Sequence, residues 1–199
     1  MAVGDFVKWA TVLQPFWMGI FVSVVIGVAL TLPISSAAIC AALGLTGLAG
    51  GAAVAGCCAQ MVGFAVMSFR ENRWGGLVAQ GIGTSMLQMP NIVKNPRIWI
   101  PPTLASAITG PLATCLFRLE MNGAAVSSGM GTCGLVGQIG VYTGWVSDIA
   151  SGVKAGITPM DWAGMLLICF VLPSLLSWAF CQLLRKIGWI KENDLKLDL

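Results

Sequence analysis

The sequence of 199 residues contains no histidine. That absence removes the side chain that most often acts as metal ligand, general base or phosphate acceptor near neutral pH. Charged residues are also scarce, at 10% of the chain against about 25% in a typical soluble domain. Because 57% of the residues are hydrophobic and the mean hydropathy is +0.85, the composition predicts an integral membrane protein.

A cysteine pair with C-x-x-C spacing is absent too, although there are seven cysteines. All of them lie in apolar or small-residue runs, which is typical of buried free thiols rather than of a disulfide framework. We therefore expect no metal site and no cofactor. The net charge of +3 is too small to indicate a nucleic-acid partner. The cysteines are Cys40, Cys57, Cys58, Cys115, Cys133, Cys169 and Cys181.

Long apolar runs are plentiful, and four of them approach the roughly 20 residues that a membrane-crossing helix needs. They cover residues 16–38, 45–69, 97–117 and 162–184. Pro33 is expected to kink or end the first run near its far side. In the second, Gly47 and Gly51 have the spacing that lets another helix approach closely. Gln60 is a lone polar group there, and we expect it to hydrogen-bond between helices.

Two further segments, residues 74–95 and 123–145, are neither clean spans nor polar loops. The second has seven glycines and few large side chains, which favours a re-entrant hairpin or a helix buried in protein. The positive-inside rule then predicts both termini on the cytoplasmic side, with residues 185–199 as a cytoplasmic tail. The expected fold is one all-α polytopic membrane domain over residues 1–199, with about four full transmembrane helices and two re-entrant or broken-helix elements.

The stretch 81–111 combines five prolines with many amides and hydroxyls, which hydrocarbon tolerates only when protein walls them off. Uncharged donors and acceptors of this kind suit a neutral sugar or polyol. Arg97 could grip an anionic group or extend to the interface, and Gln88 and Asn91 could instead satisfy main-chain groups freed by prolines. No nucleophile–base pair is present, so the chain should not be catalytic alone. The candidate binding residues are Thr84, Ser85, Gln88, Asn91, Asn95, Arg97, Thr132 and Gln138.

Several long motifs carry a family resemblance. They are SMLQMPNIVKNPRIWIPPTLASAITGPLA, the following SSGMGTCGLVGQIG, and the preceding stretch from PISSAAIC to SFRENRWGG. Over residues 15–145 the chain resembles the putative sugar permeases, enzyme IIC, of the bacterial phosphotransferase system. Asn95 and Pro96 are similar to the Asn-Pro of the lactose- and cellobiose-type permeases. Those permeases keep a sugar-binding glutamate near the position of Gly83 or Thr84, where this chain has no acid.

The resemblance implies a multi-pass permease component of the bacterial inner membrane that holds a sugar while a phosphorylated IIB protein modifies it. It also implies a homodimer, or pairing with a missing N-terminal half, because the chain begins where such permeases have their middle. Two alternatives remain open: a non-transporting sensor or regulatory subunit that keeps a permease-like fold, and a small-solute channel, which would need a continuous polar path.

Overall fold

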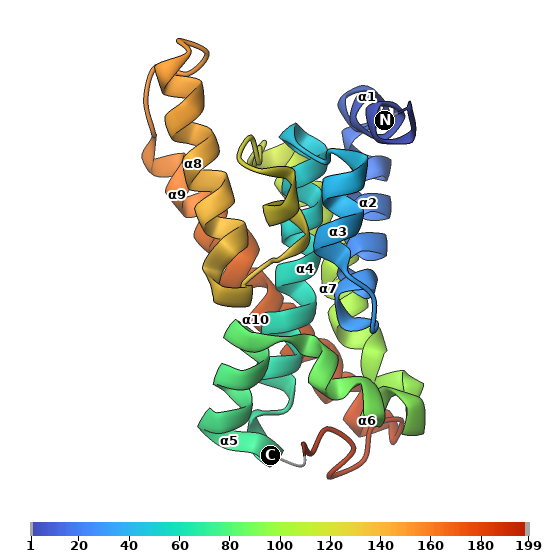
Figure 1. Cartoon of the computed structure of the whole chain (residues 1–199). Coiled ribbons are helices and arrows are strands. Elements are labelled where there is room, and N and C mark those ends of the chain that lie inside the picture. The colour runs from blue at the N-terminus through green and yellow to red at the C-terminus, as the bar shows by residue number, and fades with distance from the viewer. Residues whose placement is uncertain (1, 198–199) are drawn as a thin grey trace.

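The computed structural model describes residues 2–197, and within that range helices are the main regular secondary structure and there is no β-strand (Figure 1). An isolated antiparallel bridge joins Gly47 to Met121. The all-α prediction is therefore confirmed for the described residues. Residue 1 and residues 198–199, which end the predicted tail, lie outside them.

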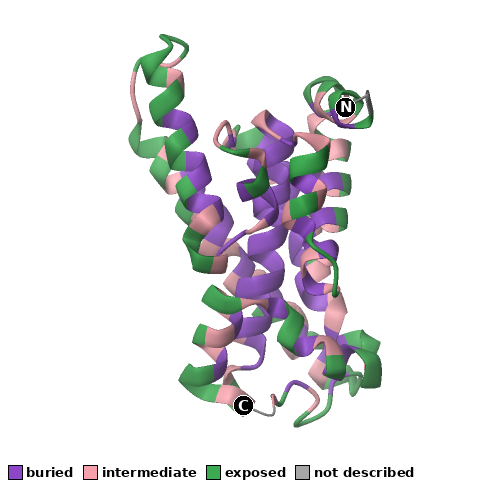
Figure 2. Ribbon diagram, in the orientation of Figure 1, coloured by how far each residue is buried: buried purple, intermediate pink, exposed green. Residues whose placement is uncertain are grey.

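The central element is α4 (Gly47–Met67), which is buried along its whole length except at Gly47 and Val66 (Figure 2). Small residues allow this, because a Cβ at Gly56 would overlap the main chain of α2 and one at Gly63 would overlap a side chain of α10. The expected close approach at Gly51 also occurs, but its neighbour is the non-helical main chain at Leu119 rather than a helix.

The first apolar run is two helices, not one span over residues 16–38. Helix α2 (Pro15–Thr31) ends just before Pro33, as proline predicts, and α3 (Ser36–Leu43) then returns alongside α2 (Figure 1). The hydroxyl of Ser35 caps α3 by accepting a hydrogen bond of 3.1 Å from a first-turn main-chain N–H.

Because α3 brings the chain back, α2 and α4 run in the same direction. Ser23 lies against Gly56, and Thr31 lies within hydrogen-bonding distance of Gln60 further along both helices. The N-terminal helix and the C-terminal tail consequently lie at opposite ends of α4 (Figure 1). The sequence predicts the first two apolar runs as an antiparallel pair, and therefore both termini at one end. In the structure the two ends of the chain lie apart instead.

Helix α1 (Ala2–Leu13) was not expected as a separate element. It crosses the end of the bundle and is seen end-on in Figure 1, whereas α2 is seen from the side. Its outer surface is apolar and exposed at Val3, Phe6, Trp9 and Val12. An apolar stripe of this kind on a helix at the end of a membrane bundle is typical of a helix lying in the interface.

Between α4 and α7 the chain forms short helical pieces rather than a span. They are α5 (Phe69–Val78), a π-helical turn (Ala79–Gly83), a 3₁₀ turn (Ser85–Gln88) and α6 (Met89–Lys94). The first two run back along α4, because Gln80 hydrogen-bonds to Ser68 and Gly81 faces Ala65. The chain then turns away beneath α2. Whether residues 74–95 are re-entrant depends on where the bilayer lies and stays a prediction.

Residues 123–145 also run toward the middle of α4 and then back. Two 3₁₀ turns (Ala125–Gly129 and Cys133–Leu135) run along α4 as far as Cys57 and Cys58, and α8 (Val136–Ala150) leads back. Gly140 of α8 lies against Ser127, so the two arms pack closely. The re-entrant character of this segment also depends on where the bilayer lies and remains a prediction.

The two remaining apolar runs differ in continuity. A 3₁₀ turn (Pro96–Trp99) leads into α7 (Ile100–Pro111), which ends in a π-helical turn (Leu112–Leu116). Helix α9 (Pro159–Leu166), a π-helical turn (Leu167–Val171) and α10 (Leu172–Ile187) form one continuous helix. By length and composition, two helices in residues 2–197 could cross a membrane, Gly47–Met67 and Pro159–Ile187. Four full spans therefore remain a prediction.

Candidate functional site

Residues 74–95 and 123–145 are called here the two interrupted elements. Their tips, at Gly81 and Thr132, meet beside the middle of α4. Thr132, which is fully buried, donates a hydrogen bond of 2.5 Å from its hydroxyl to the carbonyl oxygen of Gly81. The same hydroxyl lies 3.6 Å from the sulfur of Met61. One of the predicted binding residues thus joins segments that are 51 positions apart in sequence.

The tip around Thr132 depends on left-handed backbone. Gly131 has φ +54°, and a Cβ there would come within 2.7 Å of the Cβ of Cys57. Leu135, which precedes α8, also has a positive φ of 58°, a conformation that costs free energy for a branched residue. The close fit of Gly131 against α4 sets the depth that the tip reaches.

Gln138 lies in the first turn of α8 and is 7% exposed. Its amide nitrogen donates to the sulfur of Cys58 at 3.2 Å. Its amide oxygen is buried and has no hydrogen-bond partner within the described part of the chain. A buried acceptor without a donor costs about 1–3 kcal/mol, so this oxygen is suited to accept from a hydroxyl.

Ser85 belongs to a second interior group on the other side of α4. Its hydroxyl lies 2.8 Å from that of Thr31, which in turn lies 3.3 Å from the side-chain oxygen of Gln60. Gln60 also accepts from the indole N–H of Trp99 at 3.0 Å and donates to Thr103 at 3.3 Å. The prediction that Gln60 hydrogen-bonds between helices is confirmed. Thr31, Trp99 and Thr103 were not among the residues selected from the sequence. The signal that could have found them is a polar atom near the end of an apolar run.

Three other predicted residues hold the C-terminal tail, residues 189–197. The side-chain amides of Gln88, Asn91 and Asn95 donate to main-chain carbonyls of the tail at 3.1, 2.8 and 3.0 Å, respectively. Asn72 adds two more hydrogen bonds to the same segment. In this structure these amides are therefore occupied by the chain itself.

The last two predicted residues have local roles. The Thr84 hydroxyl accepts from the main-chain N–H of Met86 at 3.2 Å and so caps the following turn. Arg97 is exposed, and its guanidinium lies 5.1 Å from the ring centre of Trp189 in the tail. The eight candidates thus form two groups: Ser85, Thr132 and Gln138 lie in the interior, and the others lie at the surface or against the tail.

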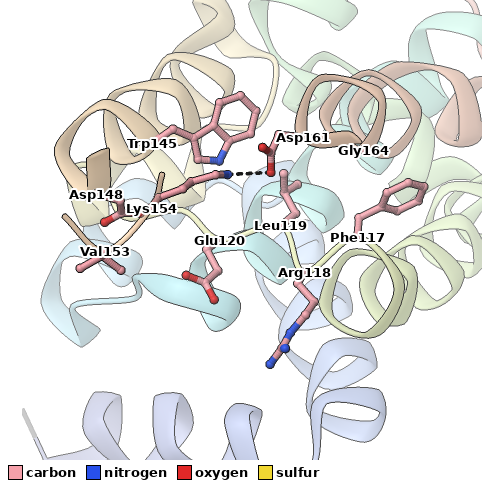
Figure 3. Close-up of a pocket in the computed structure, with 10 residues that line it drawn as sticks. All are labelled: Phe117, Arg118, Leu119, Glu120, Trp145, Asp148, Val153, Lys154, Asp161 and Gly164. Carbon is pink, nitrogen blue, oxygen red and sulfur yellow. Dashed lines mark ion pairs between the residues drawn. The ribbon is translucent and has the colours of Figure 1, made fainter. Parts of the chain in front are cut away.

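A separate cavity of about 300 Å³ opens near the N-terminal end of the bundle (Figure 3). Lys154 pairs with Asp161 at 2.7 Å across it and lies 5.1 Å from the ring centre of Trp145. Glu120 is part of the lining, whereas the guanidinium of Arg118 points away from the Lys154–Asp161 pair. None of the predicted binding residues lines this cavity.

The buried polar tips, interrupted helices and apolar surface are features of a solute permease, and a comparison with protein families agrees. The family model described as "Phosphotransferase system, EIIC" matches residues 1–197. The chain belongs to this family. No curated protein and no solved structure matches the chain.

Membership in the EIIC family confirms the resemblance seen in the sequence motifs and extends it from residues 15–145 to nearly the whole chain. EIIC proteins are the membrane permease components of the sugar phosphotransferase system, so sugar transport in a membrane context follows for this chain. Partnership with a IIB protein follows in the same general sense.

Proposed function

We propose that this EIIC protein binds a neutral sugar or polyol where the two interrupted elements meet, at Thr132, Gln138 and the carbonyl of Gly81. The proposal is carried by the Thr132–Gly81 hydrogen bond together with the buried oxygen of Gln138, which has no donor within residues 2–197. Both features lie next to α4 near its middle, at the sulfurs of Met61 and Cys58. A polar site of this kind, at broken helices in an apolar bundle, is typical of solute transporters.

The chemistry of these groups suits hydroxyls. A sugar hydroxyl can donate to the free oxygen of Gln138 or to the Gly81 carbonyl, and it can accept from Thr132. Charged side chains do not take part in these contacts, which favours a neutral solute over an anionic one. One side-chain hydrogen bond links the Thr132 tip to Gly81, and such a bond contributes about 1 kcal/mol, so a solute that replaces it can separate the tips.

We also propose that the tail end of the bundle faces the cytoplasm, and the distribution of charge supports this. Eight of the eleven Lys and Arg residues lie at that end, and three lie at the end that carries α1. The positive-inside rule then puts the tail inside and α1 outside, and a phosphorylated IIB protein would approach the tail end. The eight are Arg70, Arg73, Lys94, Arg97, Arg185, Lys186, Lys191 and Lys196. A homodimer remains part of the proposal.

Binding of sugars to the purified protein tests the site. We expect Thr132→Val and Gln138→Leu each to weaken binding of radiolabelled sugar by about tenfold, the effect of losing roughly 1.4 kcal/mol. The matched control is Thr143→Val, because Thr143 lies on the same helix as Gln138 but is exposed. Unchanged affinity in both site variants, with the control also unchanged, would remove the site from consideration.

Uptake by vesicles that contain the protein, with and without a phosphorylated IIB partner, separates transport from regulation. We expect uptake that depends on the partner and is lost in Thr132→Val. Sugar binding without any uptake would instead support the non-transporting sensor.

A further inference from the structure

Three cavities join into one groove, called here the α4–α5–α10 groove. The outer cavity, of about 470 Å³, shares Arg70 and Gln182 with a middle cavity of about 240 Å³. The middle cavity shares Val66 and Leu77 with an inner one, also of about 240 Å³. Shared lining residues make the three cavities neighbours, so together they form an elongated groove rather than isolated pits.

The groove runs along the last helix. It is lined in order by Phe170, Ser174, Trp178, Gln182 and Lys186, whose spacing of four residues makes a continuous row that winds gradually around the helix. Sixteen residues at 1.5 Å each give a length of about 24 Å, which is comparable to most of the thickness of a bilayer core.

The groove changes character along its length. The outer cavity is lined by Arg70, Lys186 and Lys191, opposed by Glu192. Arg185 lies there as well, but its guanidinium is paired with Glu71 at 2.6 Å. Within residues 2–197, Arg70, Lys186 and Lys191 form no ion pair, and three such cations against one carboxylate leave the outer cavity positive.

The other two cavities are mainly apolar. Met67, Phe69 and Trp178 line the middle one, and Val62 and Phe170 line the inner one. The inner one ends at Gly81, whose carbonyl accepts from Thr132. A ligand that fills the groove would therefore support the tip of the first interrupted element.

We propose that the α4–α5–α10 groove binds a phospholipid with an anionic head group, and that an acyl chain lies in its middle and inner cavities. A positive outer cavity continuous with an apolar channel matches the two ends of such a molecule. The basic end also lies at the end of the bundle where cationic residues gather, which is where anionic head groups meet a membrane protein. A sugar or free phosphate would leave the apolar length unused.

Lipid binding by the detergent-purified full chain tests the proposal by native mass spectrometry. The probes are dioleoyl phosphatidylglycerol, dioleoyl phosphatidylcholine and inorganic phosphate. We expect bound phosphatidylglycerol at concentrations about tenfold below those at which phosphatidylcholine binds. Inorganic phosphate at millimolar concentration should not displace it, because the acyl chain contributes most of the affinity.

Two variants act on different parts of the groove. Lys186→Gln combined with Lys191→Gln should abolish the preference for phosphatidylglycerol, and Ser174→Phe should weaken binding of both lipids by filling the inner cavity. The controls are Lys94→Gln, an exposed cation outside the groove, and Ala179→Phe, an exposed position on the same helix that does not line it. Equal binding of the two lipids by the unmodified chain, displacement by phosphate, or unchanged binding in both groove variants would each overturn the proposal.

Discussion

Most polar side chains buried inside the bundle have hydrogen-bond partners, although a few buried atoms, among them Ser177 Oγ, have none within the described residues. Gln60 shows the rule, since its oxygen accepts from Trp99 and lies 3.3 Å from the hydroxyl of Thr31. Gln138 shows the exception, because one of its amide atoms has no partner in the described residues. Unsatisfied buried groups are rare in native proteins, so the amide oxygen of Gln138 is one of the few buried atoms that could accept from an incoming hydroxyl.

Glycine at position 56 should be essential for the contact between α2 and α4. A Cβ there would overlap the carbonyl of Ser23, and neither main chain can move without disturbing the buried cluster around it. We expect Gly56→Ala to lower the free energy of unfolding by at least about 1–3 kcal/mol, as overpacked cores do. Thermal unfolding in detergent measures this.

Gly75→Ala is the matched control, because a Cβ at Gly75 meets no atom within 4 Å. Its free energy of unfolding should change by less than about 1 kcal/mol, and helix propensity favours a gain. Equal melting temperatures for the two variants would show that the close contact at Gly56 does not limit stability.

Interrupted helices are the elements that distinguish this fold from a simple bundle. Pro33 stops α2, and α3 then begins with a serine cap. Pro173 lacks the N–H that a regular helix needs, and the preceding turn is π-helical. The C-terminal tail is a further element, because its Ile190 and Leu195 are buried among residues of α4 and α10 and it is held by side-chain amides.

Asn95→Ala should loosen the tail. It removes hydrogen bonds to Trp189 and to Asp194, and the loss of about 1 kcal/mol makes the open tail roughly fivefold more populated. Limited trypsin digestion should then cut after Lys191 about fivefold faster, as read by mass spectrometry of the released peptide. Val93→Ala, which is exposed on the neighbouring α6, serves as control. Identical cleavage rates in the two variants would mean that the amide does not hold the tail.

The molecule as a whole has a charge asymmetry that its topology creates. With α3 as a short return, α2 and α4 run in parallel, and the two ends of the chain separate along the bundle (Figure 1). An antiparallel first pair would have put Lys8 at the same end as the basic tail. The observed arrangement instead puts Lys8 at the opposite end from the eight cations near the tail.

Cysteine labelling tests this arrangement in the membrane. In a variant with Cys115 and Cys133 replaced by alanine, we expect Ser151→Cys to react with a membrane-impermeant maleimide on intact cells. Glu192→Cys should react only after permeabilisation. Both positions are exposed, and the five remaining cysteines are buried. The parent variant without an added cysteine measures background. Labelling of both positions from the same side would contradict the proposed orientation.

Much of the architecture was predictable from local patterns. Apolar composition indicated the membrane, and proline and glycine positions indicated where helices break, because both act within a few residues of themselves. Five of the seven cysteines are buried as expected, whereas Cys115 is exposed and Cys133 is partly exposed. Among the predicted binding residues, Thr132 lies against Gly81 whereas Asn91 lies against the tail, and solute binding by any of them stays a prediction.

The sequence by itself determined that the chain is helical and apolar, where its helices are interrupted and to which family it belongs, since composition, proline and motif are properties of neighbouring residues. Only the tertiary structure decided that α2 and α4 are parallel and that the tail occupies Gln88, Asn91 and Asn95. Those contacts join residues up to 107 positions apart. Pairing over such distances depends on which buried groups find partners when the helices assemble, and a linear pattern does not contain that information.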